Sequence, residues 1–142
     1  MRVSEFMTRK VITASPDVGI RETYFAMREN GIRHMPVLDG AQLVGMISDR
    51  DLRRPDWVDE APDLAYDYHL EDNVTVGDLM SRNPILVHTY DELGLACKLI
   101  VQHGFGALPV LDKGGHLVGI ISKADLVRAF AALLEDAHPP FS

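Results

Sequence analysis

The chain has 142 residues, 46% of them hydrophobic, as expected for one compact globular domain. Its formal net charge of -7 argues against nucleic-acid binding, because a protein that neutralises phosphates needs a basic face. No apolar run approaches the roughly 18 residues of a membrane span, and the first residues lack the apolar core of a signal peptide. The single cysteine, Cys97, allows no internal disulfide. Together these features favour a cytoplasmic protein without a membrane or nucleic-acid partner.

In chain order, the first predicted element is a short apolar strand at residues 12–14. Residues 15–17, Ser-Pro-Asp, then resemble a helix start, with a capping side chain and a first-turn proline. The predicted helix ends at Gly31, since glycine adopts the left-handed cap without strain. Its apolar face consists of Ile20, Tyr24 and Met27.

Two apolar strands and a second helix follow. The strand at 35–38 begins next to a proline, a turn at 39–40 closes a hairpin, and residues 43–47 form the returning strand. The returning strand is almost wholly apolar, as buried strands tend to be. Ser48 then stands where strand gives way to helix, so the unit reads β-α-β-β-α.

The same order of elements occurs a second time. Residues 76–82 match residues 3–9 at an offset of 73, and residues 117–122 match residues 43–48 at an offset of 74, because the second turn is one residue longer. The second copy predicts a strand at 85–87, a helix ending at Gly104, a hairpin spanning 108–121 and a final helix. The stripe of its first helix is Leu93, Ala96, Cys97 and Ile100; that of its last is Leu126, Val127, Phe130, Leu133 and Leu134.

The duplication predicts an α+β (α/β) fold of two repeats. The boundaries expected are repeat 1 at 1–53, an acidic connecting segment at 54–73, repeat 2 at 74–134 and a tail at 135–142. One repeat has a sheet and two helices but little interior. The two are therefore expected to pack sheet to sheet about an approximate two-fold axis, as one module.

The ordered pattern closely resembles the CBS repeat. Its elements are a glycine-closed helix, Pro36-Val37-Leu38-Asp39, then Leu43 to Ser48 followed by Asp51-Leu52, and all occur twice. The resemblance covers nearly the whole chain apart from the connecting segment and the tail. It implies a CBS pair (Bateman module) with two clefts for AMP, ADP, ATP, S-adenosylmethionine or a related adenosyl ligand. Such modules commonly form dimers, and some bind nothing and serve only in assembly.

The resemblance also implies roles for particular residues. Asp51 and Asp125 would hold the ribose, because a carboxylate can accept hydrogen bonds from both hydroxyls of a diol. Ser48 and Ser122 would contact the ribose or the nearest phosphate. Helix-start chemistry alone also places Ser and Asp at these positions, so that alternative stays open.

The remaining cleft residues would bind phosphate and adenine. Phosphate needs cations or helix N-termini. The candidate cations are Arg33, His34 and Arg50 in repeat 1 and Lys123 in repeat 2, and this asymmetry predicts unequal clefts. The adenine pocket would be lined by Ile12, Thr13, Met35 and Pro36 in one cleft and by Ile85, Leu86, Leu108 and Pro109 in the other. Solvated surface cations and ordinary core packing are the alternatives.

No catalytic or metal motif appears in the sequence. There is no Walker loop, no Gly-x-Ser-x-Gly elbow and no His-Glu-x-x-His, and the histidines lack metal-ligand spacing. Cys97 reads as a small core residue rather than a nucleophile. We therefore expect a non-enzymatic sensor that needs no cofactor or metal and acts on a regulated protein on another chain. A ligand-free dimerisation module is the alternative. The last helix is a candidate homodimer interface, with packing within the chain as the other interpretation.

Overall fold

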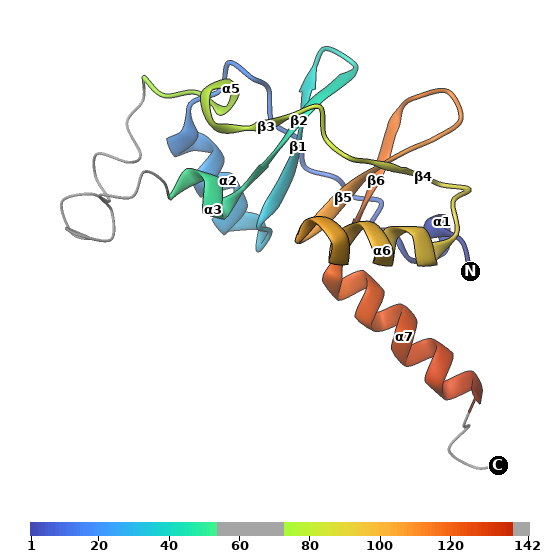
Figure 1. Cartoon of the computed structure of the whole chain (residues 1–142). Helices are drawn as coiled ribbons and strands as arrows, with labels where there is room; N and C mark the ends of the chain where they lie inside the picture. The colour runs from blue at the N-terminus through green and yellow to red at the C-terminus, as the bar shows by residue number, and fades with distance from the viewer. Residues whose placement is uncertain (54–72, 138–142) are drawn as a thin grey trace. The chain divides into compact units, whose positions relative to one another are not determined.

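The computed structural model describes residues 1–53 and 73–137 of the chain (Figure 1). The acidic connecting segment expected at 54–73 and the tail at 135–142 therefore lie mostly outside the described residues. The chain forms two compact units. We call Ile12–Pro84 the repeat-1 unit, and Met1–Val11 together with Ile85–Ser142 the repeat-2 unit.

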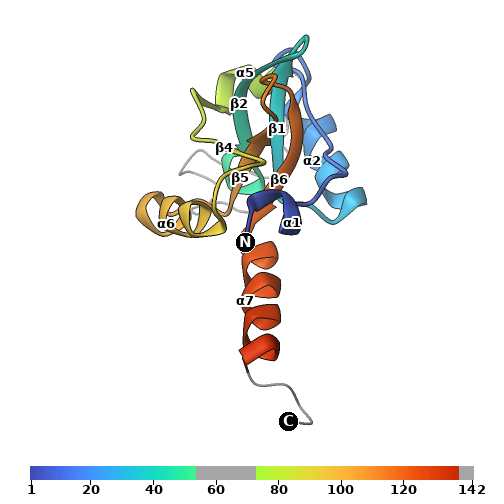
Figure 2. The same ribbon diagram turned by 90° about the vertical axis from the view of Figure 1, so that its right-hand side faces the viewer.

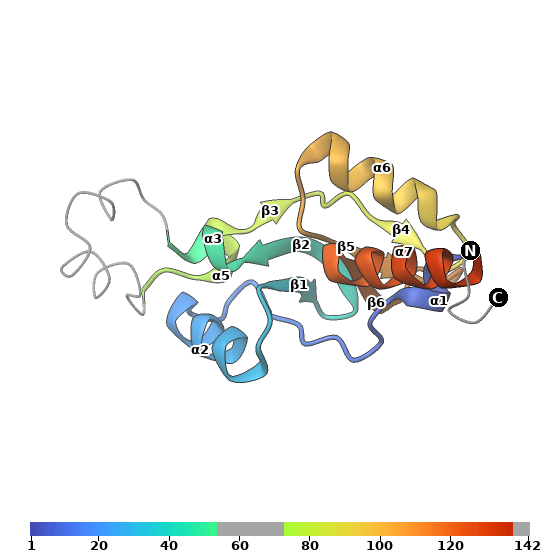
Figure 3. The ribbon, with the colours of Figure 1, turned by 90° about the horizontal axis from the view of Figure 1, so that it is seen from below.

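The repeat-1 unit is a small sheet with helices packed on it. Its elements are α2 (Ile20–Asn30), β1 (His34–Asp39), β2 (Gln42–Ser48), α3 (Asp49–Leu52), α5 (Val76–Leu79) and β3 (Ser81–Arg82). The strands lie in the order β1-β2-β3 and both pairs are antiparallel. Ala14 pairs in parallel with Val37 at the β1 edge. Helix α2 lies alongside β1 (Figure 3), and Ile20 and Met27 pack with Val37 and Ile47 in one buried cluster.

The repeat-2 unit has the corresponding elements. They are α1 (Val3–Phe6), β4 (Val87–His88), α6 (Leu93–His103), β5 (Ala107–Leu111), β6 (Leu117–Ser122) and α7 (Lys123–Ala137). The sheet order is β4-β5-β6, with β4 parallel and β6 antiparallel to β5. Leu108, Val110 and Ile121 form its core together with Val3 from the chain's start. Helix α7 continues well beyond the sheet of its unit (Figure 2).

Each unit is completed by a segment that precedes the other repeat in the sequence. Thr8 forms an antiparallel bridge with Ile120 on β6, and Ser81 of β3 pairs with Met46 on β2 at the corresponding place. The compact units therefore divide the chain at different points from the sequence repeats. The mixed α+β fold of two β-α-β-β-α repeats is confirmed. Their packing sheet to sheet about a two-fold axis stays a prediction.

The glycine caps and hairpin turns are as predicted. Gly31 and Gly104 end α2 and α6 with φ of 63° and 72°, in the left-handed region. Gly40 and Gly115 have φ of 62° and 82° in the two hairpin turns. These positions favour glycine because a Cβ is strained there.

Two local predictions were wrong. Residues 15–17 form a turn, and α2 begins later, at Ile20 with Gly19 as its N-cap. Cys97 is exposed rather than in the core, because Leu93, Ala96 and Ile100 already make up the buried face of α6. For the apolar stripe on α7, a homodimer interface and packing within the chain were both open. The stripe is largely exposed, and the buried positions of α7 are Asp125 and Ala129. The exposed members are Val127, Phe130, Leu133 and Leu134.

Candidate ligand site

The first candidate site lies where β2 ends and α3 begins. Ser48 is the N-cap of α3, and its Oγ accepts a hydrogen bond from the Asp51 backbone N–H at 3.2 Å. Asp51 returns the contact, since its Oδ2 accepts from the Ser48 N–H at 2.9 Å. This reciprocal capping box satisfies two backbone donors at the helix start. Among the described residues, Oδ1 of Asp51 accepts no hydrogen bond, and the side chain is only half-buried.

The structure brings the predicted cations of repeat 1 to the same strand end. The Asp49 N–H donates to the Arg33 carbonyl at 2.9 Å, and His34 lies opposite Ser48 in the β1–β2 register. Arg33 and Arg50 are both exposed, so their side chains are free of the core. The residues at this junction therefore include one carboxylate and two exposed arginines, a combination suited to a sugar bearing phosphate.

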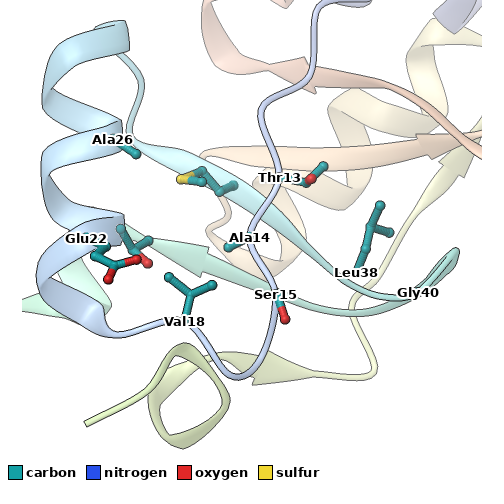
Figure 4. A pocket seen from close by; sticks show the side chains of 10 residues that line it. Thr13, Ala14, Ser15, Val18, Glu22, Ala26, Leu38 and Gly40 are labelled. Carbon is teal, nitrogen blue, oxygen red and sulfur yellow. The ribbon is translucent and has the colours of Figure 1, made fainter. Parts of the chain in front are cut away.

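A pocket of about 530 Å³ lies within the repeat-1 unit (Figure 4). Thr13 and Met35, two predicted adenine residues, line it. Thr13 belongs to a lining segment, residues 13–15, that also includes Ala14. Ile12 is half-buried and Pro36 is buried, but neither lines the pocket. The segment is held to β1 because the Ala14 N–H donates to the Pro36 carbonyl at 3.0 Å.

The other wall of this pocket comes from residues that sequence reasoning missed. Glu22 and Ala26 face it from α2, and Leu38 and Gly40 border it at the far end of β1 (Figure 4). Glu22 and Ala26 stand four residues apart, a spacing that places side chains on one helix face. That spacing could have indicated a shared wall. Neither Ser48 nor Asp51 lines the pocket.

The corresponding junction of repeat 2 is closed by the chain itself. Asp125 is 1% exposed. Its Oδ2 accepts from the Ser122 N–H at 2.8 Å and from the Ser122 Oγ at 3.0 Å. Its Oδ1 accepts from the Thr8 hydroxyl at 3.1 Å and pairs with the Arg128 guanidinium. The two predicted ribose-binding aspartates therefore have different surroundings.

Sequence reasoning missed Thr8 and Arg128 as partners of Asp125. Arg128 follows Asp125 by three residues, a spacing that places two side chains side by side on a helix. Thr8 comes from the opposite end of the chain. The only sequence signal for it was the repeated Met-Thr and Met-Ser pair, Met7-Thr8 and Met80-Ser81. That repeat did not show which unit each copy joins.

The other predicted residues of repeat 2 differ in burial. The Lys123 N–H donates to the Gly106 carbonyl at 3.1 Å, and the Lys123 side chain is exposed. Leu108 and Pro109 are buried in β5, whereas Ile85 and Leu86 are half-buried. Burial of the β5 pair is what core packing alone requires, so these residues stay predictions as an adenine pocket.

Two carboxyl groups outside these junctions, those of Asp78 and Asp112, have a lowered pKa. The backbone N–H of Thr75, and then its hydroxyl, hold the pKa of Asp78 below its ordinary value at the start of α5. The backbone N–H of His116 does the same for the pKa of Asp112 in the β5–β6 turn. In both cases the pKa falls because the hydrogen bonds favour the charged form of the carboxyl group.

The described residues contain neither a metal-binding cluster nor a membrane-spanning helix. No group of three or more His, Cys, Asp or Glu side chains in those parts of the chain is placed to hold a metal ion. No helix there is long and apolar enough to cross a membrane.

The comparisons with known proteins identify the family. A sequence model of the CBS domain matches residues 3–55 and 76–132, so the chain belongs to the CBS domain family. The resemblance inferred from the sequence is thereby confirmed. A CBS domain-containing protein of Dictyostelium discoideum is 30% identical over 144 residues, which cover 96% of each chain. The chain spans less than half of two uncharacterized Methanocaldococcus jannaschii proteins, 44% and 47% of their lengths, at 30% identity.

Solved structures show the same fold. The CBS-pair protein CBSX2 from Arabidopsis thaliana is 28% identical with a TM-score of 0.83, covering 94% of this chain and 96% of its own. A structure of CBSX2 in complex with AMP has a TM-score of 0.77 at 29% identity, covering 94% and 98%. The CBS domain pair of protein MJ0100, in complex with 5′-methylthioadenosine and S-adenosyl-L-methionine, is 25% identical with a TM-score of 0.73 and covers 92% and 99%.

Proposed function

We propose that this CBS pair is a regulatory module that binds an adenosyl ligand at the β2–α3 junction of repeat 1. One observation carries the proposal. One oxygen of the Asp51 carboxylate accepts a hydrogen bond from the Ser48 N–H, while its other oxygen has no partner in the described chain. Support comes from the related CBS pairs that bind AMP or S-adenosyl-L-methionine. A ribose supplies the two adjacent hydroxyl donors that such a half-satisfied carboxylate can accept.

The neighbouring residues suit the rest of such a ligand. Arg33 and Arg50 are exposed at the same strand end and can reach a phosphate. Thr13 and Met35 line the pocket of the same unit and offer a partly apolar surface to a base. Which adenosyl compound binds depends on the charge beyond the ribose, because a sulfonium and a phosphate require opposite partners.

Thermal melting with AMP, ATP and S-adenosylmethionine tests the proposal. A ligand at 100 times its dissociation constant adds about 2.7 kcal/mol to the free energy of unfolding. We expect at least one compound to raise the melting temperature, and D51N to remove most of that rise. The matched control is D49N, which removes a charge from the same helix and should keep the rise. No shift with any of the compounds at millimolar concentration would refute the proposal.

A second candidate, assembly without ligand, rests on α7. Phe130 and Leu134 are 59% and 48% exposed, and Val127 is 67% exposed, which leaves an apolar helix face uncovered. A second copy of the chain is the proposed occupant, making a homodimer. The first proposal, the regulatory module, also includes action on a regulated protein of another chain, the lack of enzymatic activity and of a required cofactor, and a cytoplasmic location.

A further inference from the structure

We propose that Asp125 serves as a latch for the N-terminal segment, residues 2–9, and that an adenosyl ligand binds at Asp51 alone. The second half of this inference rests on the proposed function, whereas the first half does not. The proposal gives different roles to two aspartates that occupy equivalent positions in the two repeats and that have the same role in the family pattern.

The acceptor capacity of Asp125 is already used. Ser122 donates twice to Oδ2, and Thr8 and Arg128 donate to Oδ1. An ionised carboxylate offers about four lone-pair sites, so these four contacts leave none for a ribose diol. The side chain itself has no exposed surface. A ligand would have to displace one of these hydrogen-bond partners. That is costly because the buried carboxylate would then lack a hydrogen bond that offsets its desolvation.

The Thr8 hydroxyl is placed by a backbone that is itself fixed to β6. The Thr8 N–H donates to the Ile120 carbonyl at 2.8 Å, and the Ile120 N–H donates to the Thr8 carbonyl at 3.0 Å. This pair of bonds sets Thr8 on the strand that leads directly to Ser122. Hydrogen bonds therefore connect the N-terminal segment both to β6, through the Thr8 backbone, and to α7, through the Thr8 side chain and Asp125.

The equivalent contact is missing in repeat 1. Ser81, which follows Met80 as Thr8 follows Met7, pairs with Met46 on β2 but is exposed. Within the described parts of the chain, its hydroxyl makes no hydrogen bond to Asp51. Arg54, the counterpart of Arg128, lies outside the described residues. The two aspartates therefore differ in one contact. The Thr8 hydroxyl donates to Asp125, whereas the Ser81 hydroxyl does not reach Asp51.

Amide hydrogen exchange tests the latch without any ligand. T8V removes the hydroxyl and preserves the shape of the side chain, whereas T8S restores the hydroxyl. We expect T8V to lower the protection from exchange of the backbone amides at positions 8 and 120 about tenfold, the effect of losing one hydrogen bond to a charged group. T8S should stay close to wild type, and the Leu38 amide of the repeat-1 unit should not change. Equal protection in T8V and T8S would overturn the latch.

Calorimetric titration tests the choice of site, with AMP and S-adenosylmethionine as probes. We expect one ligand per chain, affinity within about threefold of wild type in D125N, and at least a tenfold loss in D51N. Two ligands per chain, or loss of binding in D125N with binding kept in D51N, would overturn the single-site assignment. Absence of binding to the wild type would refute the proposed function and the single-site assignment with it. The exchange experiment would still decide the latch.

Discussion

The glycine of β6 provides the sharpest test of how the N-terminal segment is held. A Cβ added at Gly119 would lie 2.7 Å from the Met7 sulfur and 3.0 Å from the Thr8 carbonyl oxygen. The methionine side chain can rotate away, but the carbonyl oxygen accepts the Ile120 N–H and cannot move without breaking that bond. Overpacking of this kind costs about 1–3 kcal/mol. At roughly 2–4 °C per kcal/mol for a chain near this size, G119A should lower the melting temperature by about 2–12 °C.

The matched control makes the same chemical change in open space. Gly94 lies in α6 with no atom within 4 Å of an added Cβ, so G94A should be neutral or stabilise by up to about 1 kcal/mol. Thermal melting followed by circular dichroism measures both variants. If G119A melts at the wild-type temperature, the N-terminal segment does not approach β6 as closely as described, and the latch argument loses its backbone support.

Two further predictions concern assembly and pH. If α7 forms a homodimer interface, F130E should shift the sedimentation coefficient from that of a dimer to that of a monomer. Q102E, at an exposed position of α6, should leave the coefficient unchanged. An F130E variant with the wild-type sedimentation coefficient would count against the interface. Because hydrogen bonding to Thr75 lowers the folded-state pKa of Asp78, its stabilising contribution is present above the unfolded pKa and is lost as pH falls through the lowered folded value. D78N should therefore melt below wild type at pH 6 and converge with it at strongly acidic pH, and a constant difference across that range would contradict this reasoning.

The repeat architecture could be predicted from sequence because it depends on local chemistry. Gly31 and Gly104 mark helix ends by a conformation that other residues adopt only with strain. Ser48 and Ser122 mark strand-to-helix junctions by capping, which needs only neighbours in the chain. Duplication of the pattern then fixed the order of elements and led to the CBS family.

The partners of the two aspartates could not be predicted in the same way. Thr8 reaches Asp125 across 117 positions of sequence, and nothing in the repeat shows which unit the N-terminal segment joins. The start of α2 was misplaced because Ser15 carries a capping side chain, yet its Oγ faces the Asp17 N–H at 3.5 Å in a turn. Cys97 was misplaced because the helical period alone does not show how wide the buried stripe is.

The unequal clefts expected from the sequence take a different form in the structure. The sequence argument compared cations, Arg33 and Arg50 against Lys123. The structure adds a difference in the carboxylates, because Asp125 is enclosed by the chain and Asp51 is half-buried with one oxygen unsatisfied. The cation difference alone did not indicate which repeat binds, because residues from both repeats could contact one ligand. The carboxylate difference is what favours repeat 1 in the proposed function.

A crystal structure of the full chain grown with the adenosyl compound that stabilises it most tests the central claim most directly. The account predicts ribose hydroxyl oxygens at hydrogen-bond distance from Asp51, about 2.5–3.0 Å, with Thr8 still bound to Asp125. Ribose bound to Asp125 in place of Thr8, with no ligand at Asp51, would contradict it.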